Sequence, residues 1–282
     1  MVWTIGNLRN WCMEFLEKRG LDSPRLDVEL LMAKATGMER INLYVNSEQP
    51  LSNAERDILR PLIVRRANFE PVAYILGEKD FMGLTFKVNQ STLIPRPDTE
   101  NLVEYVIHQF QDQDDVVICD IGTGSGAIGL SILHYLPKAK AVLTDISAPA
   151  LEVAKANAKA LGVDDRATFI ESDMLANLTG EFDAILSNPP YIPTKDIATL
   201  ASDVKDYEPL SALDGGEDGL KFYKILLRET AKFLKQGGFL GIEIGLNQEK
   251  AILPLLGEEW KLKEMLKDLA HINRNLILEV NS

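Results

Sequence analysis

The chain has 282 residues, of which 46% are hydrophobic and 26% are charged. This composition is typical of a globular protein and excludes collagen-like, low-complexity and wholly disordered chains. The formal net charge is −12. Residues 1–80 hold 11 basic and 12 acidic side chains, a net of −1, and residues 81–282 hold 19 and 30, a net of −11. Because an acidic surface repels phosphate backbones, we expect no direct binding of nucleic acid.

The sequence also argues against a membrane protein and against a metal site. It contains no uninterrupted apolar run of about 18 residues, so we expect no membrane-spanning helix. Its start lacks a basic segment followed by an apolar core, so we expect no signal peptide. The two cysteines, Cys12 and Cys119, are too few for a disulfide framework or a zinc site. We therefore expect a cytoplasmic protein with reduced thiols and no bound metal.

The first part of the chain, residues 1–75, is predicted to form a small helical domain. Apolar side chains recur at helical spacing over residues 8–16. Residues 23–37 begin with Ser-Pro and end with Gly, which is the expected order of a helix start and stop. Residues 52–68 open with a Ser-x-x-Glu capping box.

Proline and glycine then interrupt the helical pattern at Pro71, Gly77 and Gly83. Residues 72–76 and 84–88 are predicted as short strands. We assign residues 76–92 to a β-hairpin linker and residues 93–282 to a second, larger domain. A helix is expected to open within residues 93–100 and to run to about residue 111.

The larger domain alternates between strands and helices. Strands are predicted at residues 116–120, 141–145, 167–171, 182–187 and 239–244, and two more at 260–268 and 276–280. Helices are predicted at residues 125–136, 149–161 and 220–235. This alternation predicts an α/β fold, in which a parallel sheet of up to seven strands carries helices on both faces.

A glycine-rich turn follows the first of these strands. It consists of the residues Asp120, Ile121, Gly122, Thr123, Gly124, Ser125 and Gly126. Glycines allow a sharp turn and a close approach to a ligand, and the following helix start offers free N–H groups. Because ligands of parallel sheets bind beyond the strand carboxyl ends, the turn is predicted to hold a cofactor.

Three residues after the next strands narrow the choice of cofactor. Asp145 ends the second strand, where a carboxylate accepts the two hydroxyls of a ribose. Asp173 is expected to accept from the adenine amine, with Met174 covering the ring. The glycines also fit the dinucleotide pattern G-x-G-x-x-G, so NAD is an alternative ligand. Asp120 favours a cationic ligand over a pyrophosphate, however, and this sign argument favours S-adenosylmethionine.

A second motif, Asn188-Pro189-Pro190-Tyr191, follows the fourth strand. Two prolines fix two φ angles and push Asn188 out of the helical region, which makes the loop stiff. The Asn188 side-chain oxygen and the Pro189 carbonyl are expected to accept the two hydrogens of a planar –NH2 group, and Tyr191 to pack against its face. The motif therefore predicts methylation of a planar nitrogen that is a weak nucleophile. No histidine looks catalytic, which fits a reaction that needs no strong base.

The chain resembles the HemK/PrmC family of protein-(glutamine-N5) methyltransferases that act on bacterial release factors. The stretches that match are residues 71–77, 93–100 (Leu-Ile-Pro-Arg-Pro-Asp-Thr-Glu), 120–126, 188–191, 207–209 and 237–239. Residues 93–100 are the most specific of these. The resemblance spans nearly the whole chain, including the helical N-terminal part.

The resemblance implies a seven-stranded, Rossmann-like domain dependent on S-adenosylmethionine, preceded by a helical domain that docks the substrate. The implied reaction is methylation of the glutamine in the Gly-Gly-Gln motif of peptide-chain release factors, by a monomeric enzyme. Carried over by position, the glycine turn, Asp145, Asp173 and Met174 hold the cofactor, and Asn188 to Tyr191 hold the glutamine amide. Asn188 is expected to contact the cofactor as well. Arg96 and Glu100 belong either to a loop over the active site or to an ion-paired helix start.

Other functions are open from the sequence. An adenine methyltransferase of nucleic acid uses the same Asn-Pro-Pro-Tyr motif, but it requires a basic cleft, against which the net −11 of residues 81–282 speaks. Another alternative is a binding module that has lost catalysis. The intact Asn188 and glycine turn argue against it, because such a module would not need them. A dehydrogenase leaves the Asn-Pro-Pro-Tyr motif without a role.

Overall fold

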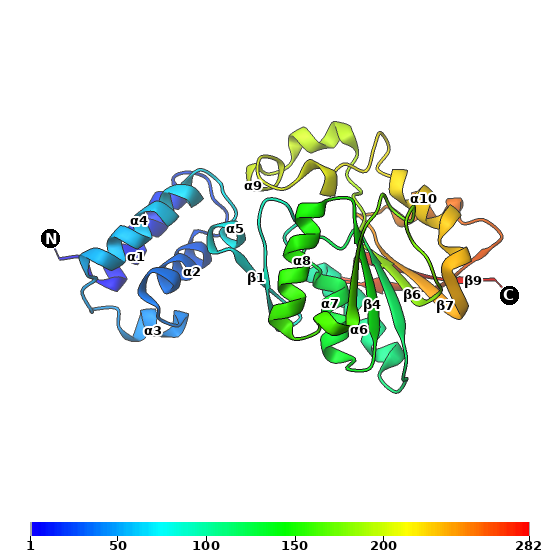
Figure 1. The fold of residues 1–282 in the computed structure, drawn as a ribbon. Coiled ribbons are helices and arrows are strands. Elements are labelled where there is room, and N and C mark those ends of the chain that lie inside the picture. The colour runs from blue at the N-terminus through cyan, green and yellow to red at the C-terminus, as the bar shows by residue number, and fades with distance from the viewer. Residues whose placement is uncertain (1, 282) are drawn as a thin grey trace. The chain divides into compact units, whose positions relative to one another are not determined.

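The computed structural model describes residues 2–281, which fall into two compact units. The first unit contains residues 1–77 together with 201–207, and the second contains residues 78–200 and 208–282. Figure 1 shows the first unit as an all-helical body and the second as a sheet covered by helices. Within residues 2–281, none of the helices has the length and apolar character needed to span a bilayer.

The first unit is a bundle of short helices around its own core. Its helices are α1 (Ile5–Glu17), α2 (Pro24–Thr36), α3 (Arg40–Val45), α4 (Asn53–Ala67), α5 (Val72–Leu76) and α9 (Ser202–Lys205). The predicted capping box is confirmed, because Ser52 Oγ accepts from Glu55 N and Glu55 accepts from Ser52 N. The predicted stop is also confirmed, because Gly37 ends α2 with φ +69°. The core includes Ile5, Leu16, Leu31, Met32 and Leu43, all of them buried.

The strand predicted over residues 72–76 is wrong, because these residues form the helix α5. Pro71 precedes the helix at the N-cap position, and the left-handed Gly77 ends it. Five apolar residues are too short a run for periodicity to separate helix from strand. Here packing against α2 and α4 selects the helix.

A short segment far along the sequence packs on this bundle. Residues 201–207 contain α9, and Tyr207 Oη donates to the carbonyl oxygen of Asn68 at 2.6 Å. The buried Arg66 lies 3.7 Å from the Asp203 carboxylate and makes a closer pair with Asp27 at 2.6 Å. The helical unit is therefore discontinuous in sequence. The predicted domains, residues 1–75, 76–92 and 93–282, instead place residues 201–207 in the larger domain.

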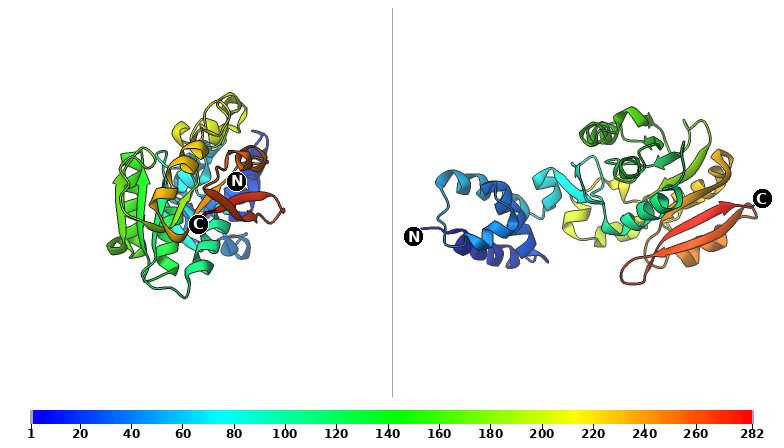
Figure 2. Two further views of the ribbon diagram at one scale, coloured as in Figure 1. Left: turned by 90° about the vertical axis from the view of Figure 1, so that its right-hand side faces the viewer. Right: turned by 90° about the horizontal axis from the view of Figure 1, so that it is seen from below.

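The second unit is built on a seven-stranded sheet with the order β5-β4-β3-β6-β7-β9-β8. The strands are β3 (Val117–Ile121), β4 (Lys140–Asp145), β5 (Ala167–Glu171), β6 (Phe182–Ser187), β7 (Leu234–Glu243), β8 (Trp260–Lys267) and β9 (Asn273–Val280). Neighbours pair in parallel from β5 to β7, whereas β9 pairs antiparallel with both β7 and β8. Figure 2 shows these last two strands, in orange and red, at one edge of the sheet.

The sheet is thus mixed rather than parallel throughout. The reason is the short connection between β8 and β9, which leaves room for a hairpin but not for a crossover helix. The seven strands that were predicted are all present. The strand predicted at 239–244 begins earlier, at Leu234, and the preceding helix is correspondingly shorter.

Helices cover both faces of this sheet, as predicted (Figure 1). One core contains side chains of α6 (Pro97–Phe110), α7 (Ala127–Tyr135) and α8 (Ala148–Leu161). The other contains side chains of α10 (Lys221–Glu229) and α11 (Glu249–Ile252). Short 3-10 helices connect the elements: η1 (Asp164–Arg166), η2 (Thr194–Thr199), η3 (Leu210–Ala212), η4 (Ala231–Phe233) and η5 (Leu253–Leu255).

A β-hairpin precedes α6 and belongs to the second unit. It is formed by β1 (Glu78–Phe81) and β2 (Leu84–Lys87), which pair antiparallel. Phe81 and Phe86 bury their rings in the core under α6, α7 and α8. Asn157 of α8 holds β2, because its Oδ1 accepts from Lys87 N and its Nδ2 donates to Lys87 O. A hairpin is therefore present within residues 76–92, as predicted, but its first strand is Glu78–Phe81 and not residues 72–76. The hairpin is anchored to the larger unit.

Candidate active site

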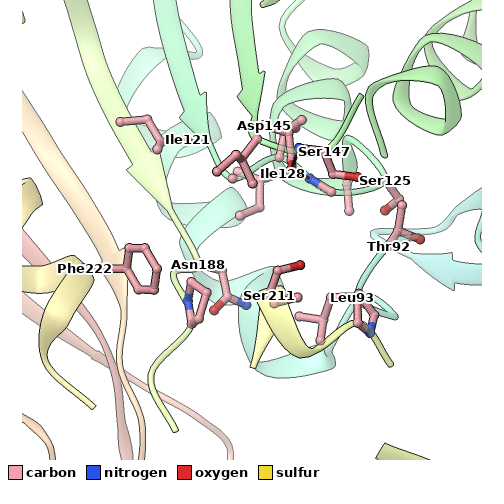
Figure 3. A pocket seen from close by; sticks show the side chains of 18 of the residues that line it. Thr92, Leu93, Ile121, Ser125, Ile128, Asp145, Ser147, Asn188, Ser211 and Phe222 are labelled. Carbon is pink, nitrogen blue, oxygen red and sulfur yellow. Dashed lines mark hydrogen bonds between the residues drawn. The ribbon is translucent and has the colours of Figure 1, made fainter. Parts of the chain in front are cut away.

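A cavity of about 530 Å³ lies at the carboxyl ends of the parallel strands, and all of its lining residues belong to the second unit. Ile121, Asp145 and Asn188 line it where β3, β4 and β6 end. Figure 3 shows Asp145 and Ser147 across the hollow from Leu93 and Ser211, with Asn188 and Phe222 on a further side. This volume lies in the range of small-molecule sites.

The glycine turn forms one wall of the cavity. Gly122, Gly124 and Gly126 all have left-handed φ angles, of +70°, +56° and +85°. Of the predicted residues here, Gly122, Thr123, Gly124 and Ser125 line the cavity. Gly126 lies behind them at the start of α7, where a Cβ atom would come within 2.5 Å of Leu130 Cδ1. Glycine is therefore required at position 126 by both backbone and packing.

Asp120 supports this turn from behind. Its side chain is fully buried, and its Oδ2 accepts from Thr123 Oγ1 at 2.6 Å and from Gly129 N at 3.0 Å. Its other oxygen, Oδ1, is buried and has no hydrogen-bond partner. Burial raises the pKa of Asp120 to about 6. The structure thus places Asp120 under the turn and not among the residues that line the cavity.

Asp145 lies at the cavity wall and shapes the turn from the next strand. Its Oδ2 accepts from Gly124 N at 2.8 Å, and its Oδ1 accepts from Ser147 N at 2.9 Å. Burial raises its pKa, although the backbone donors oppose the rise. Each carboxylate oxygen has further lone pairs after these bonds. Both oxygens can therefore accept from ligand hydroxyls as well.

The two residues predicted to contact adenine, Asp173 and Met174, also line the cavity. Asp173 is exposed, and Met174 is half-buried with a left-handed φ of +51°. Ser172 holds this conformation, because its Oγ donates to Met174 O at 3.0 Å. The loop after β5 thus presents a carboxylate and an apolar side chain to the same cavity as Asp145.

The structure separates the four residues of the Asn-Pro-Pro-Tyr motif. Asn188 and Pro190 line the cavity, whereas Pro189 is buried and is not among the lining residues. Tyr191 packs against the core around α10 instead, and burial raises its pKa to about 12. Its carbonyl oxygen accepts from Gln248 Nε2 at 2.9 Å, which holds the end of the loop. Asn188 is therefore the polar side chain that the motif offers to the cavity.

Two buried residues beside Asn188 were not predicted from the sequence: Thr99, which also lines the cavity, and Glu243, which does not. The Asn188 side-chain amide donates to Thr99 Oγ1 at 3.3 Å, and Thr99 Oγ1 in turn donates to Glu243 Oε2. Thr99 lies within residues 93–100, the stretch in which the family resemblance is most specific, so the sequence could have marked it as a candidate site residue. Glu243 gave none, because it is a single acidic residue at the end of β7.

Arg96 and Glu100 have different surroundings. Arg96 lines the cavity and pairs with the buried Glu208, which also accepts from Ile94 N at 3.2 Å. Glu100 accepts from Met82 N at 2.6 Å and so ties α6 to the turn of the hairpin. Arg96 therefore belongs to a loop that lines the cavity. Glu100 does not line the cavity, and its contact with the hairpin is structural. Neighbouring lining residues from Pro209 to Ala212, and Lys221 and Phe222 of α10, were not predicted.

The cavity has no histidine among its described lining residues. All three histidines, His108, His134 and His271, are exposed and lie elsewhere. Over residues 2–281, no group of three or more His, Cys, Asp or Glu side chains is arranged to hold a metal ion. The chemistry available at the cavity is therefore that of hydrogen-bond acceptors and positioned backbone groups.

Comparisons with known proteins agree with this geometry. A family model described as the PrmC N-terminal domain matches residues 7–77, and one described as the methyltransferase small domain matches residues 99–203. Among curated proteins, the chain is similar to several that are named release factor glutamine methyltransferase. The relative from Geobacter sulfurreducens is 40% identical, covering 89% of this chain and 88% of that protein. The relative from Moorella thermoacetica is 45% identical, covering 84% of this chain and 83% of that protein. The relative from Rhodopirellula baltica is 37% identical, covering 98% of this chain and 96% of that protein.

Solved structures share the fold at low sequence identity. The catalytic domain of hMettl16, in complex with an RNA hairpin, aligns with a TM-score of 0.59 at 18% identity, covering 76% of this chain and 84% of that one. Human methyltransferase 10 domain containing protein aligns with a TM-score of 0.51 at 18% identity, covering 70% and 90%. These likenesses concern the fold alone.

Proposed function

The chain belongs to the release factor glutamine methyltransferase family, and we propose that it methylates N5 of the glutamine in the Gly-Gly-Gln motif of peptide-chain release factors. The methyl donor is S-adenosylmethionine. The observation that carries the proposal is the position of Asn188, whose amide lies at the cavity and is held from behind by Thr99. A side-chain amide is a suitable acceptor for the two hydrogens of another amide.

The residues of the cavity fit the donor. When bound, S-adenosylmethionine supplies a methyl group carried on a positively charged sulfur. Asp145 has lone pairs free for the ribose hydroxyls, and Asp173 and Met174 are available to the adenine. The left-handed glycines leave room for a close approach, and the unpartnered Oδ1 of Asp120 adds negative potential behind them. The cavity therefore offers hydrogen-bond acceptors and a negative potential, both of which suit the positively charged S-adenosylmethionine.

The acceptor side of the cavity matches an amide nitrogen. An amide lone pair is delocalised into its carbonyl, so the nitrogen is a weak nucleophile. Asn188 Oδ1 and the Pro189 carbonyl, by accepting both hydrogens, increase electron density on that nitrogen and aim it at the methyl group. The nitrogen releases a proton after the transfer, so no strong base has to act first. The lack of a histidine among the described lining residues agrees with this order of events.

No observation favours nucleic acid as the acceptor. The charged side chains around the cavity are two basic ones, Arg96 and Lys221, and three acidic ones, Asp145, Asp173 and Asp214. A phosphate backbone is bound by a basic stripe, which this set does not supply. We propose a monomeric enzyme that acts in the cytoplasm on a protein substrate, without contacting nucleic acid directly.

The helical unit is proposed to dock the release factor. Ile41 and Val45 lie one turn apart on α3 and are 65% and 75% exposed. Apolar side chains so exposed are suited to a protein partner. Replacing both with aspartate is expected to raise KM for the full-length factor several-fold, leaving kcat unchanged. An unchanged KM for the full-length factor would contradict a docking role for this surface.

The proposed reaction is tested with S-adenosylmethionine that carries a heavy methyl group. The enzyme is offered an unmethylated release factor and a duplex DNA in parallel, and the label is mapped by mass spectrometry. We expect the label on the glutamine of Gly-Gly-Gln. Label on DNA adenine, or on neither substrate, would overturn the proposal, and the Asn188→Ala variant controls for transfer outside this site.

A further inference from the structure

A hydrogen-bonded chain of three residues runs from the cavity wall into the core. It links Asn188, which follows β6, to Thr99 in the first turn of α6, and Thr99 to Glu243 at the end of β7. Thr99 is 4% exposed and Glu243 is 3% exposed. The chain is therefore shielded from water, and each of its members depends on the others for hydrogen bonds.

The direction of this chain follows from the number of hydrogens available. An ionised carboxylate only accepts, so the hydroxyl hydrogen of Thr99 points to Glu243. The Thr99 oxygen then has only lone pairs for Asn188, which must turn its NH2 group toward Thr99. Its carbonyl oxygen, Oδ1, is thereby directed away from Thr99. The two ends of a side-chain amide have nearly the same shape, so packing alone does not select between them.

We propose that Glu243, both through Thr99 and by its own contact with Asn188, fixes the orientation in which Asn188 presents its oxygen to the substrate amide. This inference rests on the proposed function, because it assigns two positioning residues to the same reaction. In the opposite orientation, the NH2 group of Asn188 would face the NH2 group of the substrate. Two donors would then meet, and the acceptor that activates the nitrogen would be lost.

The surroundings of Glu243 make this orientation sensitive to pH. Burial raises the pKa of Glu243 to about 7, and the charge of Asp98 in α6 raises it further. Hydrogen bonds from Thr99 and from Asn188 itself, together with the charge of Arg274 in β9, lower it. The rings of Tyr191 and Tyr223 also lie close, and Tyr223 Oη donates to the Glu243 carbonyl oxygen at 3.0 Å. A protonated Glu243 can donate to Thr99, which is then free to donate to Asn188. Acidification below about pH 7 therefore removes the constraint on the amide.

A matched pair of substitutions at Thr99 tests the proposal. Thr99→Val keeps the shape but removes the hydroxyl, whereas Thr99→Ser keeps the hydroxyl and removes a methyl group. We expect Thr99→Val to lower kcat on a release factor by about tenfold to 100-fold, as for loss of one oriented catalytic hydrogen bond. Thr99→Ser is expected to retain most of the wild-type kcat. Cofactor affinity, measured by calorimetry, is expected to change by less than about threefold in both variants.

The pH profile separates orientation from folding. The wild-type kcat is expected to fall as the pH drops through about 7, and the Thr99→Val variant to show a smaller step. Equal kcat values for the Val and Ser variants, whether both high or both low, would overturn the proposal. So would an unchanged acid limb in Thr99→Val. A wild-type enzyme that does not methylate the release factor at all would instead overturn the proposed function.

Discussion

The two halves of the cavity each have a buried carboxylate behind them, but the two carboxylates hold different things. On the cofactor side, Asp120 binds a hydroxyl and a backbone N–H, and so fixes the path of the glycine turn. On the acceptor side, Glu243 binds Thr99, which in turn binds the side-chain amide of Asn188. One carboxylate therefore sets a backbone conformation, and the other sets which end of an amide faces the ligand.

This difference predicts whether a substitution in each half of the cavity changes the rate of transfer, the affinity for the cofactor or the stability. A change on the acceptor side leaves the shape of the cofactor cavity intact and reduces the rate of transfer. A change on the cofactor side alters the turn itself, and so reduces affinity or stability.

Asn188→Ala is expected to have the largest effect. The substitution removes the acceptor at the cavity wall, and we expect methyl transfer to fall by at least about 100-fold, the effect of losing one positioned hydrogen-bonding group in a catalytic site. Affinity for S-adenosylmethionine, measured by calorimetric titration, is expected to survive. Turnover comparable to the wild type would remove Asn188 from the mechanism.

The second prediction concerns the pH dependence of stability on the acceptor side. Glu243 has its pKa raised from 4.5 to about 7 in the folded protein. Between these values the unfolded chain releases the proton and the folded chain retains it, so the free energy of unfolding falls as pH rises. Above about pH 7 the full penalty of about 3 kcal/mol is present. Glu243→Gln removes this titration, while the titration of Asp120 is common to both proteins.

We therefore expect denaturant unfolding to show wild type losing stability relative to Glu243→Gln from pH 4 to pH 8, by about 3 kcal/mol. Unfolding free energies that stay parallel over this range would mean that Glu243 ionises normally.

The third prediction uses two glycines of the second unit as a matched pair. Gly126 and Gly162 both have left-handed φ angles, of +85° and +67°. A Cβ at Gly126 would meet Leu130 Cδ1 at 2.5 Å, whereas one at Gly162 has nothing within 4 Å. Alanine is strained by a left-handed backbone at both sites, but only Gly126→Ala adds a steric clash. We therefore expect Gly126→Ala to be less stable than Gly162→Ala by about 2 kcal/mol, the penalty for overpacking. Equal melting temperatures would show that the turn tolerates a side chain.

The smallest effect is expected at Asp145. Asp145→Ala removes the acceptors of Gly124 N and Ser147 N and the site assigned to the ribose hydroxyls. Loss of charge-assisted hydrogen bonds predicts at least about tenfold weaker binding of S-adenosylmethionine. With saturating cofactor, kcat is expected to recover toward the wild-type value. An unchanged affinity by calorimetry would contradict the ribose assignment.

Most of the fold and part of the site could be predicted from the sequence. The strand endings at Asp145 and Asn188, and the glycine turn, carry local patterns that identify both walls of the cavity. Thr99 lies within a motif, but its role depends on a hydrogen bond to a residue 144 positions away. Glu243 and Glu208 have no local pattern at all, because burial and long-range pairing define their roles.

Segments of weak local preference account for the errors. Residues 72–76 form a helix because α2 and α4 pack on them, and their five apolar residues fit a strand equally well. Residues 201–207 join the helical unit through Asp203 and Tyr207, although 123 residues separate them from Gly77. No spacing or composition marks a segment that returns to an earlier domain.

A crystal structure of the enzyme with S-adenosylhomocysteine and a Gly-Gly-Gln peptide would test the role of Asn188 directly. We expect the glutamine amide nitrogen to lie about 3 Å from both Asn188 Oδ1 and the Pro189 carbonyl oxygen, with the Asn188 NH2 group on Thr99. At a resolution better than about 1.2 Å the orientation of the Asn188 amide can be observed directly. A glutamine bound away from Asn188, or an Asn188 amide turned the other way, would contradict the account.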